Sequence, residues 1–176
     1  MKKTYSQKGF TLIEVVIVIG IIGILASIVV GSVTNARDKG ADSKIESNLG
    51  SMKTQAVLIY SENGCYAGST APESECAEEA VAAAACPTTG AAGTLFAEPS
   101  IANQIASAKQ ISKGLTSCAS TANQTAWAAA IQLKSDPSKA WCVDSKGAAK
   151  EINTGDEAPY TQTTLNADIA GAVCGS

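Results

Sequence analysis

The sequence predicts an α+β protein in which one long helix packs through its C-terminal half on a small antiparallel sheet. An unbroken apolar run at residues 10–33 continues into a helical repeat of apolar residues that ends near residue 62. Short apolar stretches then flank a Ser-Asp-Pro-Ser turn at residues 135–138, as in a β-hairpin. Six cysteines follow the apolar run. With 176 residues, the chain is too short for two ordinary domains besides this run, so we expect one disulfide-stapled head.

The first predicted element is a single helix over about residues 10–62. Its apolar part, with Glu14 as its one charged residue, has 24 residues and would rise about 36 Å, enough to cross a hydrocarbon layer of roughly 30 Å. Lysines before this run, against one Arg37 close after it, place the N-terminus in the cytoplasm. The run is too long for a cleaved secretory signal, and no small-x-small site follows it. Beyond the run, one face repeats apolar side chains at Ile45, Leu49, Met52, Ala56, Ile59 and Tyr60.

The head is predicted to combine a second helix with a three-stranded meander. Apolar residues share one face of residues 100–113, after Pro99 and before Gly114, which indicates a short helix. Residues 125–134 and 140–144 read as a hairpin with Trp127 and Trp141 in its core, and residues 148–152 as a third strand. Elsewhere we expect loop, apart from a helical turn or two at residues 80–85 and an irregular tail from Asn153 to Cys174.

Composition argues against enzymes, metal sites and nucleic-acid binding. The chain has no histidine, so it lacks the commonest general base and metal ligand, and we expect no catalytic site and no cofactor. A membrane-tethered enzyme using lysine or carboxylates is the disfavoured alternative. The net charge of -3 gives no basic surface for nucleic acid. Four acidic residues fit no calcium template, so we predict a solvated face for Asp144, Asp156, Glu157 and Asp168.

One N-terminal motif is far more specific than these patterns. Residues 8–14 read Lys-Gly-Phe-Thr-Leu-Ile-Glu and abut the apolar run. This arrangement closely resembles the processing site of type IV prepilins and type II secretion pseudopilins. The resemblance implies a pilin fold with a leader at residues 1–9, a transmembrane and filament-core helix at residues 10–33 and an extracytoplasmic head at residues 34–176. It also implies that a membrane aspartic peptidase, the prepilin peptidase, cuts between Gly9 and Phe10 and N-methylates Phe10.

Glu14 is the residue of the motif that most needs a functional reason, because a carboxylate inside an apolar span is costly to insert. The resemblance implies that Glu14 neutralises the Phe10 amine of a neighbouring subunit as the filament assembles. The alternative is that Glu14 only reaches back to the membrane interface.

The cysteines favour disulfides over a zinc site. Their spacings contain no compact zinc pattern, and their even number in an exported domain predicts three bridges, with free buried cysteines as the alternative. The candidates are Cys65, Cys76, Cys86, Cys118, Cys142 and Cys174. Similarity to pilin heads favours one pair, Cys118 with Cys142.

The function implied by the resemblance is that of a structural subunit of a bacterial type IV pilus (fimbrium) that serves adhesion, motility or DNA uptake. Its expected partners are further copies of itself, the prepilin peptidase, an inner-membrane assembly platform and, before assembly, the membrane. It would begin as a single-pass inner-membrane precursor and end in an extracellular pilus. The alternative is a pseudopilin in a periplasmic pseudopilus of a type II secretion system. The cysteine-rich head favours the pilin.

Overall fold

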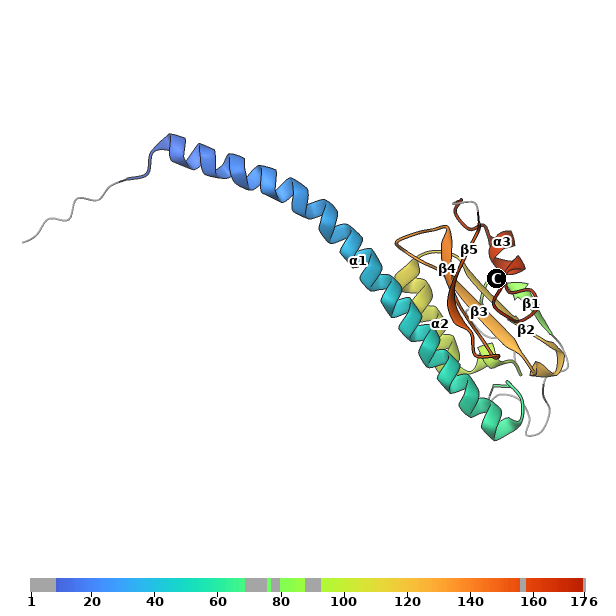
Figure 1. The fold of residues 1–176 in the computed structure, drawn as a ribbon. Coiled ribbons are helices and arrows are strands. Elements are labelled where there is room, and N and C mark those ends of the chain that lie inside the picture. The colour runs from blue at the N-terminus through green and yellow to red at the C-terminus, as the bar shows by residue number, and fades with distance from the viewer. Residues whose placement is uncertain (1–8, 69–75, 77–79, 88–92, 156–157, 176) are drawn as a thin grey trace, which may run out of the picture. The chain divides into compact units, whose positions relative to one another are not determined.

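The computed structural model describes residues 9–68, 76, 80–87, 93–155 and 158–175 (Figure 1). The chain divides into two compact units, an N-terminal unit at Met1–Arg37 and a head unit at Asp38–Ser176. Helix α1, at Leu12–Asn63, runs from the first unit into the second, which confirms the long helix predicted from the sequence. It ends at Gly64, whose φ of 73° suits glycine and whose N–H bonds to the Tyr60 carbonyl.

The head unit contains one five-stranded antiparallel sheet in the order β1-β2-β3-β4-β5. Its strands are β1 at Val81–Ala84, β2 at Thr116–Ser120, β3 at Trp127–Gln132, β4 at Lys139–Asp144 and β5 at Ala149–Asn153. The predicted hairpin is β3 with β4, and the predicted third strand is β5, so the meander is confirmed.

Two strands differ from expectation. The helical turn predicted at residues 80–85 is wrong, because Val81–Ala84 forms the edge strand β1. Strand β2, which was not predicted, supplies its backbone partner, with Val81 opposite Ser120 and Ala84 opposite Cys118. Alanine-rich segments have little strand preference of their own, so this pairing decides the structure.

The remaining helices are α2 at Pro99–Ser112, α3 at Gln162–Ala167 and the 3-10 turns η1 at Leu95–Ala97 and η2 at Ala122–Gln124. Helix α2 confirms the predicted second helix; it begins at a proline and ends at Lys113 in the left-handed region, with φ 59°. Helix α3 lies in the tail that was expected to be irregular. It begins with a capping box in which Thr161 and Thr164 bond each other's side chains and backbone N–H groups.

Two hydrophobic cores lie on opposite faces of the sheet (Figure 1). The first is shared by the head part of α1, α2 and the inner face of the sheet, and it includes Leu49, Ile105 and Trp127. Trp141 is half-buried against this same core, so both tryptophans are core residues as predicted. The second core lies under α3 and the C-terminal segment and includes Ala130, Leu165 and Ile169. All six residues of β3 are buried, since the strand is covered on both faces.

Helix α1 is fastened to the turns at both ends of β4. The buried Asp42 carboxylate accepts hydrogen bonds from the Lys134 N–H at 2.7 Å and the Ser135 N–H at 3.2 Å, in the turn before β4. The Lys53 ammonium donates to the Gly147 carbonyl at 2.6 Å, in the turn after β4. Within the head unit, α1 therefore runs in the same direction as β4.

Candidate functional site

The residues of the N-terminal motif lie at the start of α1. Phe10 is 88% exposed, and a Cβ built on Gly9 would have no heavy atom within 4 Å. Within the described residues, neither the side chain of Phe10 nor the Cα of Gly9 is covered by other parts of the chain.

Glu14 is held by a residue that sequence reasoning did not single out. Its Oε2 accepts a hydrogen bond from the Thr11 N–H at 2.8 Å and another from the Thr11 hydroxyl at 2.7 Å. The Glu14 N–H points back to the Thr11 hydroxyl oxygen at 3.4 Å. This is a capping box at the first turn of α1, and the Thr-x-x-Glu pattern before an apolar run is its sequence signal. The box fixes the Glu14 carboxylate at the tip of the helix.

A small hollow of about 290 Å³ lies beside this carboxylate, lined by Phe10, Glu14, Val15 and Val18. Its wall is apolar throughout, because Glu14 lines it with carbon atoms. Both hydrogen bonds from Thr11 reach Oε2, so Oε1 is left without a hydrogen bond to the residues that the structure describes. Such an arrangement suits an apolar group that carries a positive charge.

The rest of the N-terminal unit presents apolar side chains to its surroundings. Large side chains from Leu12 to Val29 are about half exposed or more, among them Ile13, Ile24 and Ile28. Among the residues described, α1 is the one helix long and apolar enough to cross a membrane, with a mean hydropathy of 2.9 in its most apolar window. An exposed apolar surface of this extent needs a membrane or a protein partner to cover it.

Comparison with known proteins identifies this segment. The family model of the prokaryotic N-terminal methylation motif matches residues 5–30. The type II secretion system core protein G of Klebsiella michiganensis is 38% identical over 61 residues, which cover 35% of this chain and 43% of the relative. The fimbrial protein EcpB of Eikenella corrodens is 45% identical over 60 residues, covering 34% and 38%. A type IV major fimbrial protein FimA of Dichelobacter nodosus is 44% identical over 68 residues, covering 36% and 44%.

The N-terminal segment of the chain carries the prokaryotic N-terminal methylation motif and is similar to the same segment of type IV fimbrial proteins and of type II secretion core proteins G. It spans less than half the length of these curated relatives. No solved structure matches this chain.

The cysteines of the head unit form three disulfides, as predicted, but with a different pairing. The bridges join Cys65 to Cys76, Cys86 to Cys118 and Cys142 to Cys174. The preferred pair Cys118–Cys142 is therefore wrong.

The register of the sheet gives the reason. Cys118 on β2 lies opposite Ala129 of β3, and Cys142 on β4 lies opposite Ala130. Ala129 and Ala130 are consecutive in a strand, so their side chains point to opposite faces. The two cysteines consequently face different cores, with β3 between them.

The sequence predicted a solvated face for four acidic residues. The two that the structure describes, Asp144 and Asp168, instead accept hydrogen bonds from other parts of the head. Asp144 is 3% exposed; its Oδ1 accepts from the N–H groups of Lys146 and Ala148, and its Oδ2 from the N–H of Cys174. Asp168 accepts a hydrogen bond from the Tyr160 hydroxyl at 2.7 Å, and burial together with this bond raises the pKa of Tyr160. Asp156 and Glu157 lie outside the described residues.

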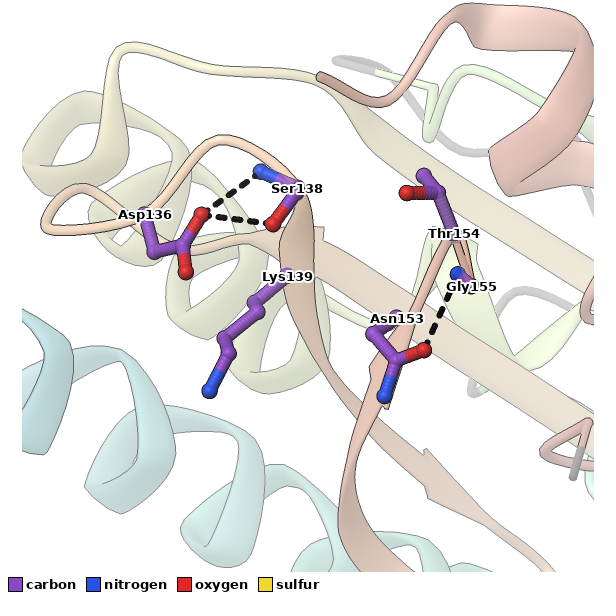
Figure 2. A pocket seen from close by; sticks show the side chains of 6 residues that line it. All are labelled: Asp136, Ser138, Lys139, Asn153, Thr154 and Gly155. Atoms are coloured by element: carbon purple, nitrogen blue, oxygen red, sulfur yellow. Dashed lines mark hydrogen bonds between the residues drawn. The ribbon is translucent and has the colours of Figure 1, made fainter. Parts of the chain in front are cut away.

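A second, polar hollow opens in the head between the turn before β4 and the end of β5 (Figure 2). Its volume is about 480 Å³, and it is lined by Asp136, Ser138, Lys139, Asn153, Thr154 and Gly155. Hydrogen bonds from Ser138 lower the pKa of Asp136, and the Glu151 carboxylate at 2.8 Å raises the pKa of Lys139. Both groups are thus held in their charged forms, as surface charges usually are, and neither is tuned toward proton transfer.

Within the described part of the chain, no three His, Cys, Asp or Glu side chains are grouped as metal ligands. The candidate functional site of this chain is therefore the start of α1, where Gly9, Phe10, Thr11 and Glu14 lie together.

Proposed function

We propose that this chain is a structural subunit of a bacterial type IV pilus, matured at its N-terminus and polymerised through α1. The observation that carries the proposal is the tip of α1. The Glu14 carboxylate lies beside the exposed Phe10, at the start of a long apolar surface. Exposure of such a surface to water is unfavourable. A monomer built in this way is suited to the membrane first and to a filament core afterwards.

Maturation begins with cleavage of residues 1–9. Prepilin peptidase cuts the accessible peptide between Gly9 and Phe10 and N-methylates the new amine of Phe10. Gly9 has no side chain, so the extended backbone can enter a narrow cleft. The product exposes a positively charged amine one residue before the Thr11 cap.

Assembly pairs this amine with Glu14 of a neighbouring subunit. Removing a carboxylate from water within a span is unfavourable, and a partner in the filament offsets that penalty. The capping box keeps Oε2 bonded to Thr11 and leaves Oε1 for the incoming charge. Thr11 thus acts as a positioning residue. The proposed places are the inner membrane for the single-pass precursor, with residues 10–33 as its span and residues 34–176 outside, and then the pilus outside the cell.

The second candidate is a pseudopilin of a type II secretion system, because core proteins G of such systems match the N-terminal segment as well as fimbrial proteins do. The C-terminal segment, held by Cys142–Cys174, supports the pilus, since a disulfide-held C-terminal segment is expected of pilin heads. Immunogold labelling of intact cells separates the two: labelled surface fibres support the pilus, and their absence with a defect in protein secretion on deletion supports the pseudopilus.

The substitution Glu14→Gln tests the assembly step. It keeps the shape and removes the charge, so we expect normal membrane insertion and normal cleavage after Gly9, with a steep loss of filaments sheared from cells. Glu62→Gln, at the exposed end of the same helix, is the matched control and should leave filament yield unchanged. Normal numbers of filaments containing the Glu14→Gln protein, verified by mass spectrometry, would refute charge pairing in assembly.

A further inference from the structure

All three disulfides join cysteines that are consecutive in the sequence. The first bridge uses the first and second cysteines, Cys65 and Cys76. The second uses the third and fourth, Cys86 and Cys118, and the third uses the fifth and sixth, Cys142 and Cys174. Among all ways to pair six cysteines, only one joins each cysteine to its neighbour in this manner.

The folded head buries one cysteine of the second bridge and one of the third too deeply for exchange between them. Cys118 is 1% exposed in the core beside α1 and α2, and Cys142 is 0% exposed in the core beneath α3. Strand β3 separates the two bridges. A thiolate must reach a disulfide sulfur to exchange with it, so a wrong pair trapped by folding could be corrected only by unfolding. The correct pairs must therefore form before or during the burial of the sheet.

We propose that the three bridges form in the order in which the cysteines emerge from the membrane, through a protein dithiol oxidase and without a disulfide isomerase. This inference rests on the proposed function, which places residues 34–176 on the oxidising side. The first cysteine of each pair then meets its correct partner as the next cysteine to emerge. The two form their disulfide before the following pair emerges, so they have no free thiols left to react with it.

Each step balances as a thiol–disulfide exchange. The first cysteine thiolate attacks the disulfide of the oxidase and forms a mixed disulfide. The second cysteine thiolate displaces the oxidase sulfur. The two thiols of the chain lose two protons and two electrons, and the oxidase is left as a dithiol. Three such steps oxidise the head.

Asp144 assists the last of these steps. It lies two residues after Cys142 on β4, so both side chains are on the same face of the sheet. Its Oδ2 accepts a hydrogen bond from the Cys174 N–H at 3.0 Å, which holds Cys174 beside its partner. Cys142 and Cys174 are 32 residues apart, and the loop between them contains helix α3. A hydrogen bond that anchors the returning segment therefore lowers the entropy cost of bringing the two cysteines together.

The experiment expresses the full-length chain in three bacterial strains: wild type, one lacking its dithiol oxidase and one lacking its disulfide isomerase. Cells are quenched with acid, free thiols are alkylated and bridges are located by non-reducing peptide mapping. We expect the native map in wild type and without the isomerase, and six alkylated cysteines without the oxidase. Loss of the native map without the isomerase would overturn the proposal.

Two variants test whether the order of emergence selects the cysteine pairs. Cys76→Ser leaves Cys65 without its partner, so Cys65 should capture Cys86 as the next to emerge, and the Cys86–Cys118 peptide should be lost without the isomerase. The matched control, Cys65→Ser with Cys76→Ser, removes the pair and should retain Cys86–Cys118 and Cys142–Cys174 in the same strain. If Cys76→Ser alone keeps Cys86–Cys118 without the isomerase, folding and not emergence selects the pairs, and the proposal fails.

Protease treatment of spheroplasts distinguishes this failure from failure of the proposed function. A head that is digested from outside but carries scrambled bridges defeats the inference alone. A head that is protected and fully reduced in wild type defeats the proposed export, and the order of oxidation with it.

Discussion

At the scale of single residues, two carboxylates of helix α1 have different roles. Glu14 lies at the exposed tip of α1 and, among the described residues, shares hydrogen bonds only with Thr11. Asp42 lies 28 positions later, is buried and holds the backbone of the turn before β4. The sequence predicted that Glu14 matters, because it is alone in an apolar run. It did not predict Asp42, which lies among other charged residues and differs from them only through contacts with residues 134 and 135.

The residue prediction at the N-terminus concerns Gly9. Gly9→Val adds a branched side chain at the proposed cleavage site while touching nothing in the isolated chain, so the helix should form as before. We expect an unprocessed precursor in the membrane fraction. Mass spectrometry of the purified chain reads the N-terminus, and Gly20→Val within the span serves as the control that should still be processed. A Gly9→Val protein that begins at Phe10 would contradict the assignment of this site.

The second residue prediction concerns the head. Asp42→Ala removes a carboxylate that accepts two backbone N–H groups, and should lower the free energy of unfolding by about 2 kcal/mol. Asp38→Ala is the control. It breaks only a partly exposed ion pair with Lys134 at 3.2 Å and should lower that free energy by less than about 1 kcal/mol. Urea denaturation of the full chain in detergent, followed by tryptophan fluorescence, measures both. Equal losses of unfolding free energy in the two variants would show that the buried Asp42 contact stabilises the head no more than the surface ion pair does.

At the scale of elements, β3 is the centre of the head because it is covered on both faces. Ala128, Ala129 and Ala130 let α1 and α2 approach from one side and the C-terminal segment from the other. Helix α2 and strands β3 to β5 were predictable, since turn residues and apolar periodicity mark them locally. Strand β1 and helix α3 were not, because β1 depends on pairing with β2, and α3 depends on packing Leu165 under the sheet.

The prediction for the sheet is that Ala130→Leu overfills the second core. Ala130 is 0% exposed, so a larger side chain must displace its neighbours, and the free energy of unfolding should fall by about 2 kcal/mol. Ala149→Leu on the exposed edge strand β5 should change it by less than about 0.5 kcal/mol. The same urea titration compares the two variants. If both behave alike, the C-terminal segment does not pack on this face as the structure shows.

At the scale of the whole molecule, the chain consists of a head unit with its own cores and an N-terminal unit whose apolar surface is uncovered. The candidate site at the tip of α1 could be predicted from the sequence because its motif is contiguous and local, and the roles of its residues stay predictions. Thr11 was overlooked although its capping pattern is readable. The disulfide pairing could not be predicted, because it depends on which face of the sheet each cysteine takes.

This division predicts that residues 38–176, exported behind a cleavable signal, fold as a soluble monomer with the same three bridges. The head keeps Ile45 and Leu49, which complete its first core, and Asp42, which holds the turn before β4. A fragment that begins at residue 53 lacks these side chains and should fail to fold. Size-exclusion chromatography and non-reducing peptide mapping distinguish the two results. An aggregated or scrambled 38–176 fragment would show that the N-terminal unit is needed for folding.

The fastening of α1 at both ends of β4 also determines how the head bears mechanical load. Asp42 and Lys53 hold the turns that precede and follow β4, and the helix runs along that strand. Tension applied along α1 therefore reaches β4 lengthwise, as shear. Under shear, the hydrogen bonds that join β4 to β3 and β5 share the force and must break together, whereas a strand pulled from its edge would lose them one at a time. In a fibre built from such heads, the sheets would therefore resist opening when the load acts along α1.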